Sequence, residues 1–238
     1  MKNQQKVSFL PLANILSEEL SFGTNWLVRG DQGAGKTTFA FQFLSQGLRK
    51  RESALFVAAD EPVDRVRSNL TNLGFGTLAY ERSKKIVFID ACSIDSKEEY
   101  FVTDLSDPEE LIYTLNQAIL KLEKPVRVVI DSLSSLAVHY LPQDFVSMVH
   151  EKNRRMRTEG IVLMDLYLAH TLESKERYSL TNAYDLSVDL YLAEEKGGVP
   201  KKYLRLLKVR GCSYDPRPFP YTVIAKQGIV VNKAYYQE

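Results

Sequence analysis

The stretch Gly30-Asp31-Gln32-Gly33-Ala34-Gly35-Lys36-Thr37-Thr38 decides which fold the chain is expected to adopt. It fits the pattern G-x-x-x-x-G-K-[ST] at every fixed position, which is the signature of a phosphate-binding loop. Gly33 and Gly35 allow positive φ angles and a close approach of the backbone, so that successive N–H groups can point at phosphate oxygens. The helix expected after the loop adds the positive end of its dipole at the same place.

The surroundings of the loop agree with this interpretation. The run Asn25–Arg29 predicts a buried strand, and apolar residues recur at helical spacing after the loop, at Phe39, Ala40, Phe43, Leu44, Gly47 and Leu48. Lys36 then supplies a charge near the β- and γ-phosphates, and the hydroxyl of Thr37 can ligate Mg²⁺. Because strand, glycine loop and helix follow in the required order, an ordinary glycine turn is the weaker explanation. The sequence predicts that Gly30–Thr38 bind a nucleoside triphosphate.

The bulk properties describe a chain of 238 residues, 45% hydrophobic and 26% charged, which is enough for one α/β domain over residues 1–238. The formal net charge of +1 implies no general attraction to nucleic acid or to an anionic membrane. Cys92 and Cys212 lie far apart, as expected in a reducing compartment. Residues 1–20 have the pattern of neither a signal peptide nor a membrane span, so we expect a cytoplasmic protein.

Strands and helices are expected to alternate along most of the chain. After the first strand, loop and helix, strands are predicted at residues 53–59, 85–90, 126–131 and 161–168. Helices are expected from Pro62, from Pro108 behind an N-cap at Asp107, and over residues 143–157. From Ser187 onward shorter strands follow without helices between them, and we expect antiparallel pairing there, at residues 187–193, 202–210, 218–224 and 228–231. Residues 1–24 look like a lead-in that packs on the domain edge. The prediction is an α/β fold with a mostly parallel central sheet, flanking helices and C-terminal antiparallel strands.

Three acidic residues are candidates for the remaining chemistry of a triphosphate site. Asp131 ends the β-branched run Val128-Val129-Ile130, where a carboxylate can hold Mg²⁺ through water. Asp60 and Glu61 end the second strand, at the edge where open α/β sheets bind ligands. An Asp before Pro62 is also a common helix start, so Asp60 can be a cap only. We therefore expect Glu61 to be the general base, with Asp60 and Lys36 beside it.

These motifs together resemble the KaiC-like branch of the RecA-type ATPases. The points of similarity, in the family's order, are Gly30–Leu44, Asp60-Glu61-Pro62, Ile130–Leu136, Lys208-Val209-Arg210-Gly211 and Gly228–Val231. The resemblance covers nearly the whole chain from Asn25 to Val231. It implies a single RecA-like P-loop NTPase domain that binds ATP with Mg²⁺ and hydrolyses ATP. Two stretches depart from the family's pattern: residues 11–23 lack its glycine-rich lead-in, and residues 170–184 match poorly, which leaves the sensor and any DNA-facing loop undefined.

The resemblance also implies a homo-oligomer. Subunits of this family form rings, usually hexamers, with each nucleotide site at a subunit boundary. It implies that Lys208 and Arg210 reach the γ-phosphate bound by the neighbouring subunit, where a guanidinium stabilises charge on the transferring phosphoryl group. From the residues alone, both can equally be surface charges on a hairpin.

Several functions stay open at this level. The first is a slowly hydrolysing ATPase ring whose nucleotide state regulates an unidentified protein partner. The second is a recombinase paralogue that binds single-stranded DNA, which requires a basic groove with aromatic platforms and is disfavoured by the near-neutral charge. The third is an assembly or motor accessory subunit that binds ATP with little turnover, because Asp60 stands where the family has Glu. A small-molecule kinase is the remotest, since the sequence has no arginine-rich lid.

Overall fold

The computed structural model describes residues 5–13, 15–169, 172–194 and 198–232, and within them ten strands form one large sheet. Its strand order is β12-β11-β10-β9-β3-β8-β7-β4-β5-β6. The strands are β3 (Thr24–Gly30), β4 (Ser53–Ala58), β5 (Ile86–Asp90), β6 (Tyr100–Phe101), β7 (Val126–Asp131), β8 (Ile161–Leu168), β9 (Leu186–Glu194), β10 (Pro200–Val209), β11 (Phe219–Ile224) and β12 (Gly228–Val231). The mostly parallel sheet with C-terminal antiparallel strands is confirmed.

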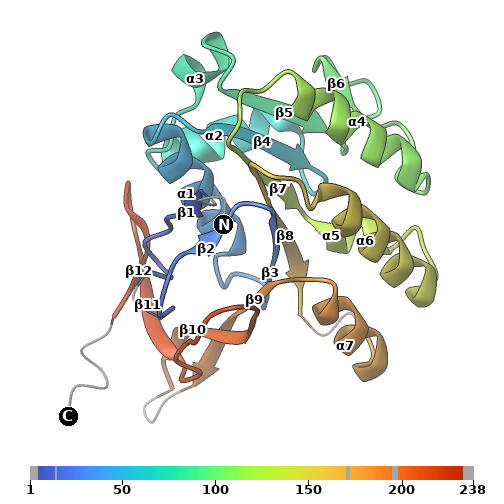
Figure 1. Ribbon diagram of the computed structural model, residues 1–238. Helices are drawn as coiled ribbons and strands as arrows, with labels where there is room; N and C mark the ends of the chain where they lie inside the picture. The colour runs from blue at the N-terminus through green and yellow to red at the C-terminus, as the bar shows by residue number, and fades with distance from the viewer. Residues whose placement is uncertain (1–4, 14, 170–171, 195–197, 233–238) are drawn as a thin grey trace.

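Helices cover both faces of this sheet (Figure 1). One face carries α1 (Lys36–Arg49) and α2 (Val63–Asn72), whose apolar side chains share a core cluster with the sheet. The opposite face carries α4 (Pro108–Leu120), α5 (Leu133–Ala137), α6 (Pro142–Met156) and α7 (Ser174–Asn182). The short α3 (Leu78–Arg82) precedes β5. At α4 the expected cap is present, because the Asp107 side chain accepts a hydrogen bond from the Glu109 N–H.

The C-terminal strands differ from the expectation in one respect. β9 pairs antiparallel with β10 but parallel with β3, so it also belongs to the parallel part of the sheet. Its parallel direction is possible because α7 lies between β8 and β9 and serves as the crossover. This helix lies in the stretch that matched the family poorly. His170 and Thr171 of that stretch lie outside the described residues.

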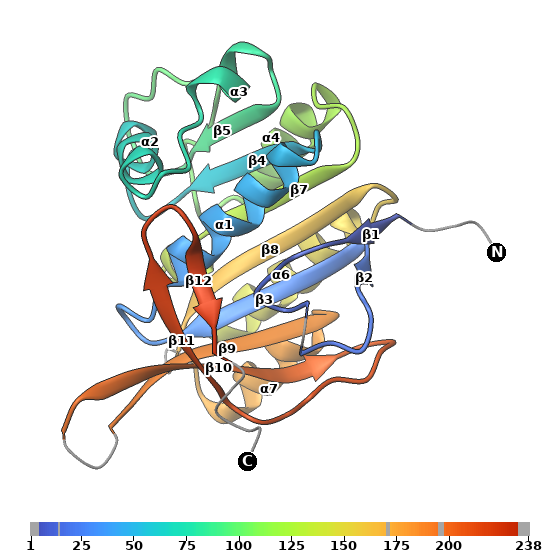
Figure 2. The same cartoon turned by 90° about the vertical axis from the view of Figure 1, so that its left-hand side faces the viewer.

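The hairpin β11–β12 folds back over α1, as Figure 2 shows. The Gln42 side chain on α1 bonds the backbone of Ile229 in both directions, with Nε2–O at 3.2 Å and N–Oε1 at 2.9 Å. The backbone N–H of Lys226, in the turn of the hairpin, donates to the Leu73 carbonyl after α2. The hairpin β11–β12 therefore contacts both α1, which follows the phosphate loop, and the end of α2, which follows the acidic pair.

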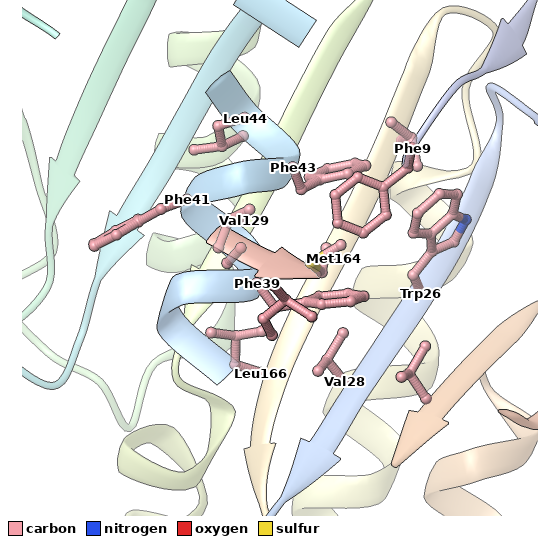
Figure 3. Close-up of a cluster of buried hydrophobic side chains, with 14 of the residues drawn as sticks. Phe9, Trp26, Val28, Phe39, Phe41, Phe43, Leu44, Val129, Met164 and Leu166 are labelled. Carbon is pink, nitrogen blue, oxygen red and sulfur yellow. The ribbon is translucent and has the colours of Figure 1, made fainter. Parts of the chain in front are cut away.

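The lead-in is more deeply embedded than a segment packed on the edge. It contains β1 (Lys6–Val7) and β2 (Leu20–Ser21), which pair with each other. Between them Phe9 enters an aromatic cluster under α1, 4.8 Å from Phe39 and 5.4 Å from Phe43 between ring centroids (Figure 3). Trp26 of β3 completes this cluster. Aromatic edge-to-face packing of this kind fixes α1 against the centre of the sheet, directly behind the phosphate loop.

Candidate nucleotide site

The phosphate loop joins β3 to α1 at the carboxyl edge of the parallel sheet, where open α/β sheets bind their ligands. Gly33 and Gly35 have φ angles of 75° and 97°, as their predicted role in turning N–H groups inward requires. At Gly30 glycine is needed for a different reason, since a Cβ there would overlap the carbonyl oxygen of Leu190 on β9. The strand before the loop is thereby held close to its neighbour, which fixes where the loop begins.

The two polar side chains at the start of α1 both make hydrogen bonds at the phosphate loop and the end of β7. Lys36 Nζ donates to the carbonyl oxygens of Gly30 and Asp31, at 3.0 and 2.9 Å, so its ammonium is folded into the loop. Thr37 Oγ1 donates to Asp131 Oδ2 at 2.8 Å. A hydroxyl oxygen and a carboxylate oxygen side by side are hard ligands of the kind that Mg²⁺ accepts. The residues present therefore fit a magnesium–nucleotide complex, which would place its metal at Thr37 and Asp131 and its phosphates along the loop.

Burial controls the charges at this edge. It raises the pKa of the Asp131 carboxyl to about 7; the hydrogen bond from Thr37 opposes this, and the charges of Asp60 and Glu61 add to it. Burial also lowers the pKa of Lys36, while the charges of Asp131, Asp31 and Asp60 act in the opposite direction. A divalent cation with its nucleotide would offset the cost of burying the charged forms of Asp131 and Lys36. It would favour the ionised carboxylate and give the ammonium an anionic partner.

The acidic pair after β4 divides between two environments. Asp60 lines a cavity next to the phosphate loop. Its Oδ1 accepts hydrogen bonds from the Ser132 N–H at 3.2 Å, the Ser132 hydroxyl at 2.9 Å and the Ser135 hydroxyl. The carboxylate of Glu61 instead contacts α2, where it accepts from Asn69 Nδ2 at 2.9 Å and pairs with Arg65 Nε at 3.1 Å. Asp60 is thus held by the segment after Asp131, and Glu61 is turned toward an exposed arginine.

A cavity of about 890 Å³ extends from the loop to β10 and β11. Thr38 and Gln32 line it, and so do Lys202 and Val223, which no sequence motif marked. Lys202 Nζ donates to the Gly33 carbonyl at 2.9 Å across 169 positions of chain. Nothing local could have identified this lysine, because its place depends on the antiparallel return of β10. Ser132 and Ser135 belong to the motif Ile130–Leu136, but their hydrogen bonds to Asp60 join residues 72 and 75 positions apart and could not be predicted from it.

Two further contacts join the phosphate loop to β9 and β11. The Tyr221 hydroxyl on β11 donates to the Ala34 carbonyl, and the Leu192 N–H on β9 donates to Asp31 Oδ2 at 3.1 Å. Among the described residues, no group of three or more His, Cys, Asp or Glu side chains is arranged to hold a metal by itself. A Mg²⁺ ion here would accordingly depend on phosphate and water for most of its ligands.

Lys208 and Arg210 lie near the amino-terminal ends of β9 and β3, at the end of the strands opposite the phosphate loop. Val209 on β10 pairs with Leu186, the first residue of β9, and Leu186 pairs with Trp26 near the start of β3. The phosphate loop leaves β3 at its far end, four residues later, roughly 13 Å along the strand. Within one chain the structure therefore does not bring Lys208 and Arg210 to Lys36.

Comparison with known proteins identifies the family of the chain. Residues 11–236 match the protein family described as "ATPase: KaiC". The chain belongs to the KaiC ATPase family. Among relatives in this family, the circadian clock protein KaiC3 of Synechocystis is 30% identical over 89% of this chain. The match spans only 42% of the length of KaiC3. A UPF0273 protein of Pyrococcus horikoshii is 30% identical over 86% of this chain and 84% of its own length.

The fold of the family is also found in a solved structure. A KaiC-like protein from Pyrococcus horikoshii OT3 superimposes with a TM-score of 0.79, over 97% of this chain and 99% of the other, at 23% sequence identity. This likeness confirms the RecA-like architecture. Among the described residues, the helices are all too short or too polar to cross a membrane.

Proposed function

We propose that this KaiC-family chain is a Mg²⁺-dependent ATPase that works as a homo-oligomeric ring and hydrolyses ATP slowly. The observation that carries the proposal is the contact between Thr37 and Asp131 beside Lys36, since it unites the loop and the metal-binding strand end. Residues Gly30–Thr38 would hold the phosphates, and Thr37 and Asp131 would hold the metal. Cytoplasmic regulation of a protein partner by the nucleotide state is part of the same proposal.

Glu61 is our proposal for the general base. Asp60 Oδ1 already accepts three hydrogen bonds from Ser132 and Ser135, which leaves that oxygen poorly placed to orient an attacking water. The pair between Glu61 and Arg65 is a weaker restraint, because the Arg65 side chain is 75% exposed and such pairs contribute little. Side chains in nucleotide-free sites commonly move when the substrate arrives. Rotation of Glu61 away from Arg65 would make its carboxylate available to the attacking water.

The ring part of the proposal is supported by the position of Lys208 and Arg210. Because they lie at the edge opposite their own loop, a role at a γ-phosphate requires a second copy of the chain. A side chain supplied in this way couples hydrolysis to assembly. The hexamer is the ring size that we favour by resemblance to the family.

Nucleotide binding is tested by titrating ATP and Mg²⁺ into wild type and Lys36→Ala. Loss of a charge-assisted contact should weaken binding by roughly 1.5–3 kcal/mol. Equal titration curves would contradict the proposed site.

Assembly is tested separately, by mixing. Arg210→Ala and Lys36→Ala subunits, each inactive alone, should regain phosphate release together, because some interfaces then pair an intact loop with an intact arginine. Specific activity of the wild type should also rise with protein concentration. A mixture that stays inactive although subunits exchange would refute the ring mechanism and leave nucleotide binding standing. Single-stranded DNA added to the same assay tests the recombinase alternative, which predicts that DNA stimulates turnover.

A further inference from the structure

The C-terminal turn of α7 is surrounded by three cationic side chains from other elements. Arg157 comes from the end of α6, Lys208 from β10, and Arg210 from the segment after β10. All three donate to the last carbonyl groups of α7, at residues 181–183, with nitrogen–oxygen distances of 2.9–3.5 Å. These carbonyls are the negative end of the helix dipole, which attracts positive charge.

One carboxylate orients two of these cations. Asp185 Oδ1 lies 2.9 Å from Arg157 Nη2 and 3.4 Å from Arg210 Nη1, and Oδ2 lies 3.3 Å from Arg157 Nε. The Asp185 side chain is 11% exposed, whereas those of Arg157 and Arg210 are 39% and 48% exposed. Its Oδ2 also accepts from the Asn25 N–H at 2.9 Å, which ties the carboxylate to β3. A rigid buried group therefore presents two guanidinium groups toward solvent.

Among the described residues, the cluster of Arg157, Lys208 and Arg210 has only one carboxylate, that of Asp185, within contact distance. Three cations against one carboxylate leave a formal charge of +2 at this place. The pKa of Lys208 is lowered, chiefly by burial and further by the charges of Arg210 and Arg157, while Asp185 opposes this. Arg157 and Arg210 also line a groove of about 660 Å³ between α6 and α7. A polyanion entering the groove would compensate the excess charge.

We propose that Arg157 is a third cation delivered to the triphosphate of a neighbouring copy, and that Asp185 is the positioning residue for Arg157 and Arg210. The inference rests on the proposed ring and extends it to residues outside the Lys-x-Arg-Gly motif. The loop bound by the same chain lies at the opposite edge, so the phosphates must come from a second molecule. On arrival, phosphate oxygens replace the α7 carbonyls as acceptors, and Asp185 keeps the guanidinium groups in place. Preorganised donors of this kind need little rearrangement as charge develops on the transferring group.

The competing explanation is that Arg157 only ties α6 to the start of β9. Arg157→Gln distinguishes the two, with Arg155→Gln as matched control, because Arg155 lies in the last turn of α6, does not line the groove and pairs with Glu109 at 2.8 Å. We expect Arg157→Gln to lower kcat about 10- to 100-fold, less than the 10³–10⁵ of a full arginine finger. The Kd for a non-hydrolysable ATP analogue and the thermal midpoint should stay near wild type. Arg155→Gln should leave all three unchanged. If Arg157→Gln fails to fold, Arg157→Met takes its place, because methionine keeps the aliphatic stem.

Mixing provides the readout that a structural role would not move. Arg157→Gln mixed with Lys36→Ala should regain turnover, because the two changes lie on opposite faces of the subunit boundary. Arg157→Gln mixed with Arg210→Ala should remain at the level of the single variants, because every boundary then lacks one of the two arginines. Asp185→Asn should behave as a variant of the same face, with a fall in kcat and rescue by Lys36→Ala only.

The outcomes separate this inference from the ring proposal. Rescue between Arg210→Ala and Lys36→Ala, with wild-type kcat in Arg157→Gln, would overturn the role of Arg157 and keep the ring. Rescue between Arg157→Gln and Arg210→Ala would show that the two arginines serve different sites, which also overturns it. Failure of every mixture, including Arg210→Ala with Lys36→Ala, would refute the ring and this inference with it.

Discussion

Thr37 at the start of α1 donates a hydrogen bond to Asp131 at the end of β7, with 2.8 Å between Oγ1 and Oδ2. The bond satisfies a buried carboxylate with a neutral donor when no cation is present. The Thr37 hydroxyl oxygen could give a lone pair to Mg²⁺ while its O–H still donates to Asp131, whose carboxylate would then hold the metal through water. The hydrogen bond therefore keeps the two side chains that would hold the metal next to each other.

The raised pKa of Asp131 predicts a pH-dependent stability of the nucleotide-free protein. Its carboxyl has a pKa of about 7 in the fold and an ordinary value of 3.8 when unfolded. Between these values the folded state binds more protons, so its free energy of unfolding falls as pH rises from about 4 to 7. Asp131→Asn removes this loss of unfolding free energy, so its thermal midpoint should lie above that of the wild type at pH 8. The difference between the two midpoints should be smaller at pH 5. Differential scanning calorimetry without nucleotide or Mg²⁺ measures both gaps. An equal gap at the two pH values would count against the shift.

Added MgATP should reverse the order. Wild type gains binding free energy on the folded state, while Asp131→Asn has lost a metal ligand and gains less. The same calorimeter run with MgATP at pH 8 provides the comparison. A midpoint that rises equally in both proteins would remove Asp131 from the metal site.

Removal of Arg65 should release Glu61 for catalysis. The change Arg65→Gln deletes the ion pair at 3.1 Å and leaves the Asn69 contact. If Glu61 is the base, kcat for phosphate release should stay the same or rise several-fold. Glu61→Gln should lower it roughly 10²–10⁴-fold with ATP binding retained. Asp60→Asn is the comparison variant, and loss of turnover there with normal turnover in Glu61→Gln would reverse the assignment.

The hairpin β11–β12 should depend on Gln42. This side chain is 4% exposed, and it makes both a donor and an acceptor bond to the Ile229 backbone. Gln42→Ala leaves these two backbone groups without partners and should cost about 1–3 kcal/mol of unfolding free energy. ATP affinity should fall as well, because the hairpin brings Val223 to the nucleotide cavity. Gln42→Glu keeps the acceptor for the Ile229 N–H but loses the donor to the Ile229 carbonyl and buries a carboxylate, so it should lose at least as much at pH 7. Urea unfolding and ATP titration of both variants test this, and equal stability of all three proteins would contradict it.

The sequence predicted those parts of the site whose signals are local. The loop Gly30–Thr38 and the strand that ends at Asp131 carry their chemistry in consecutive residues, and the parallel sheet brings their ends to one edge. Lys202 and Asp185 were beyond reach because their partners lie 169 and 28 positions away, in elements whose neighbours only the topology defines.

The direction of β9 shows the same limit for the fold. β9 precedes β10 with no helix between them, which predicts an antiparallel pair, and that pairing is present. Its parallel pairing with β3 requires a crossover helix, and α7 buries only Leu180, so it has no apolar stripe that a sequence pattern could reveal. Helices with a broad buried face, such as α4, were found because that stripe exists.

The buried pair of Lys152 on α6 and Asp165 on β8 predicts an asymmetric cost of substitution. Their Nζ and Oδ2 atoms lie 2.6 Å apart, both side chains are 0% exposed, and the Tyr184 hydroxyl donates to the same Oδ2 at 2.6 Å. Lys152→Met leaves a carboxylate without its cation in an apolar surrounding and should lower the unfolding free energy by about 3–5 kcal/mol. Adding Asp165→Asn removes the uncompensated charge and keeps an acceptor for Tyr184. The double variant should therefore be more stable than Lys152→Met alone, in urea unfolding at pH 7. The pair lies away from the loop, so ATP affinity of the folded double variant should equal that of wild type. A double variant no more stable than the single one would mean that packing of the lysine stem, rather than its charge, accounts for the loss.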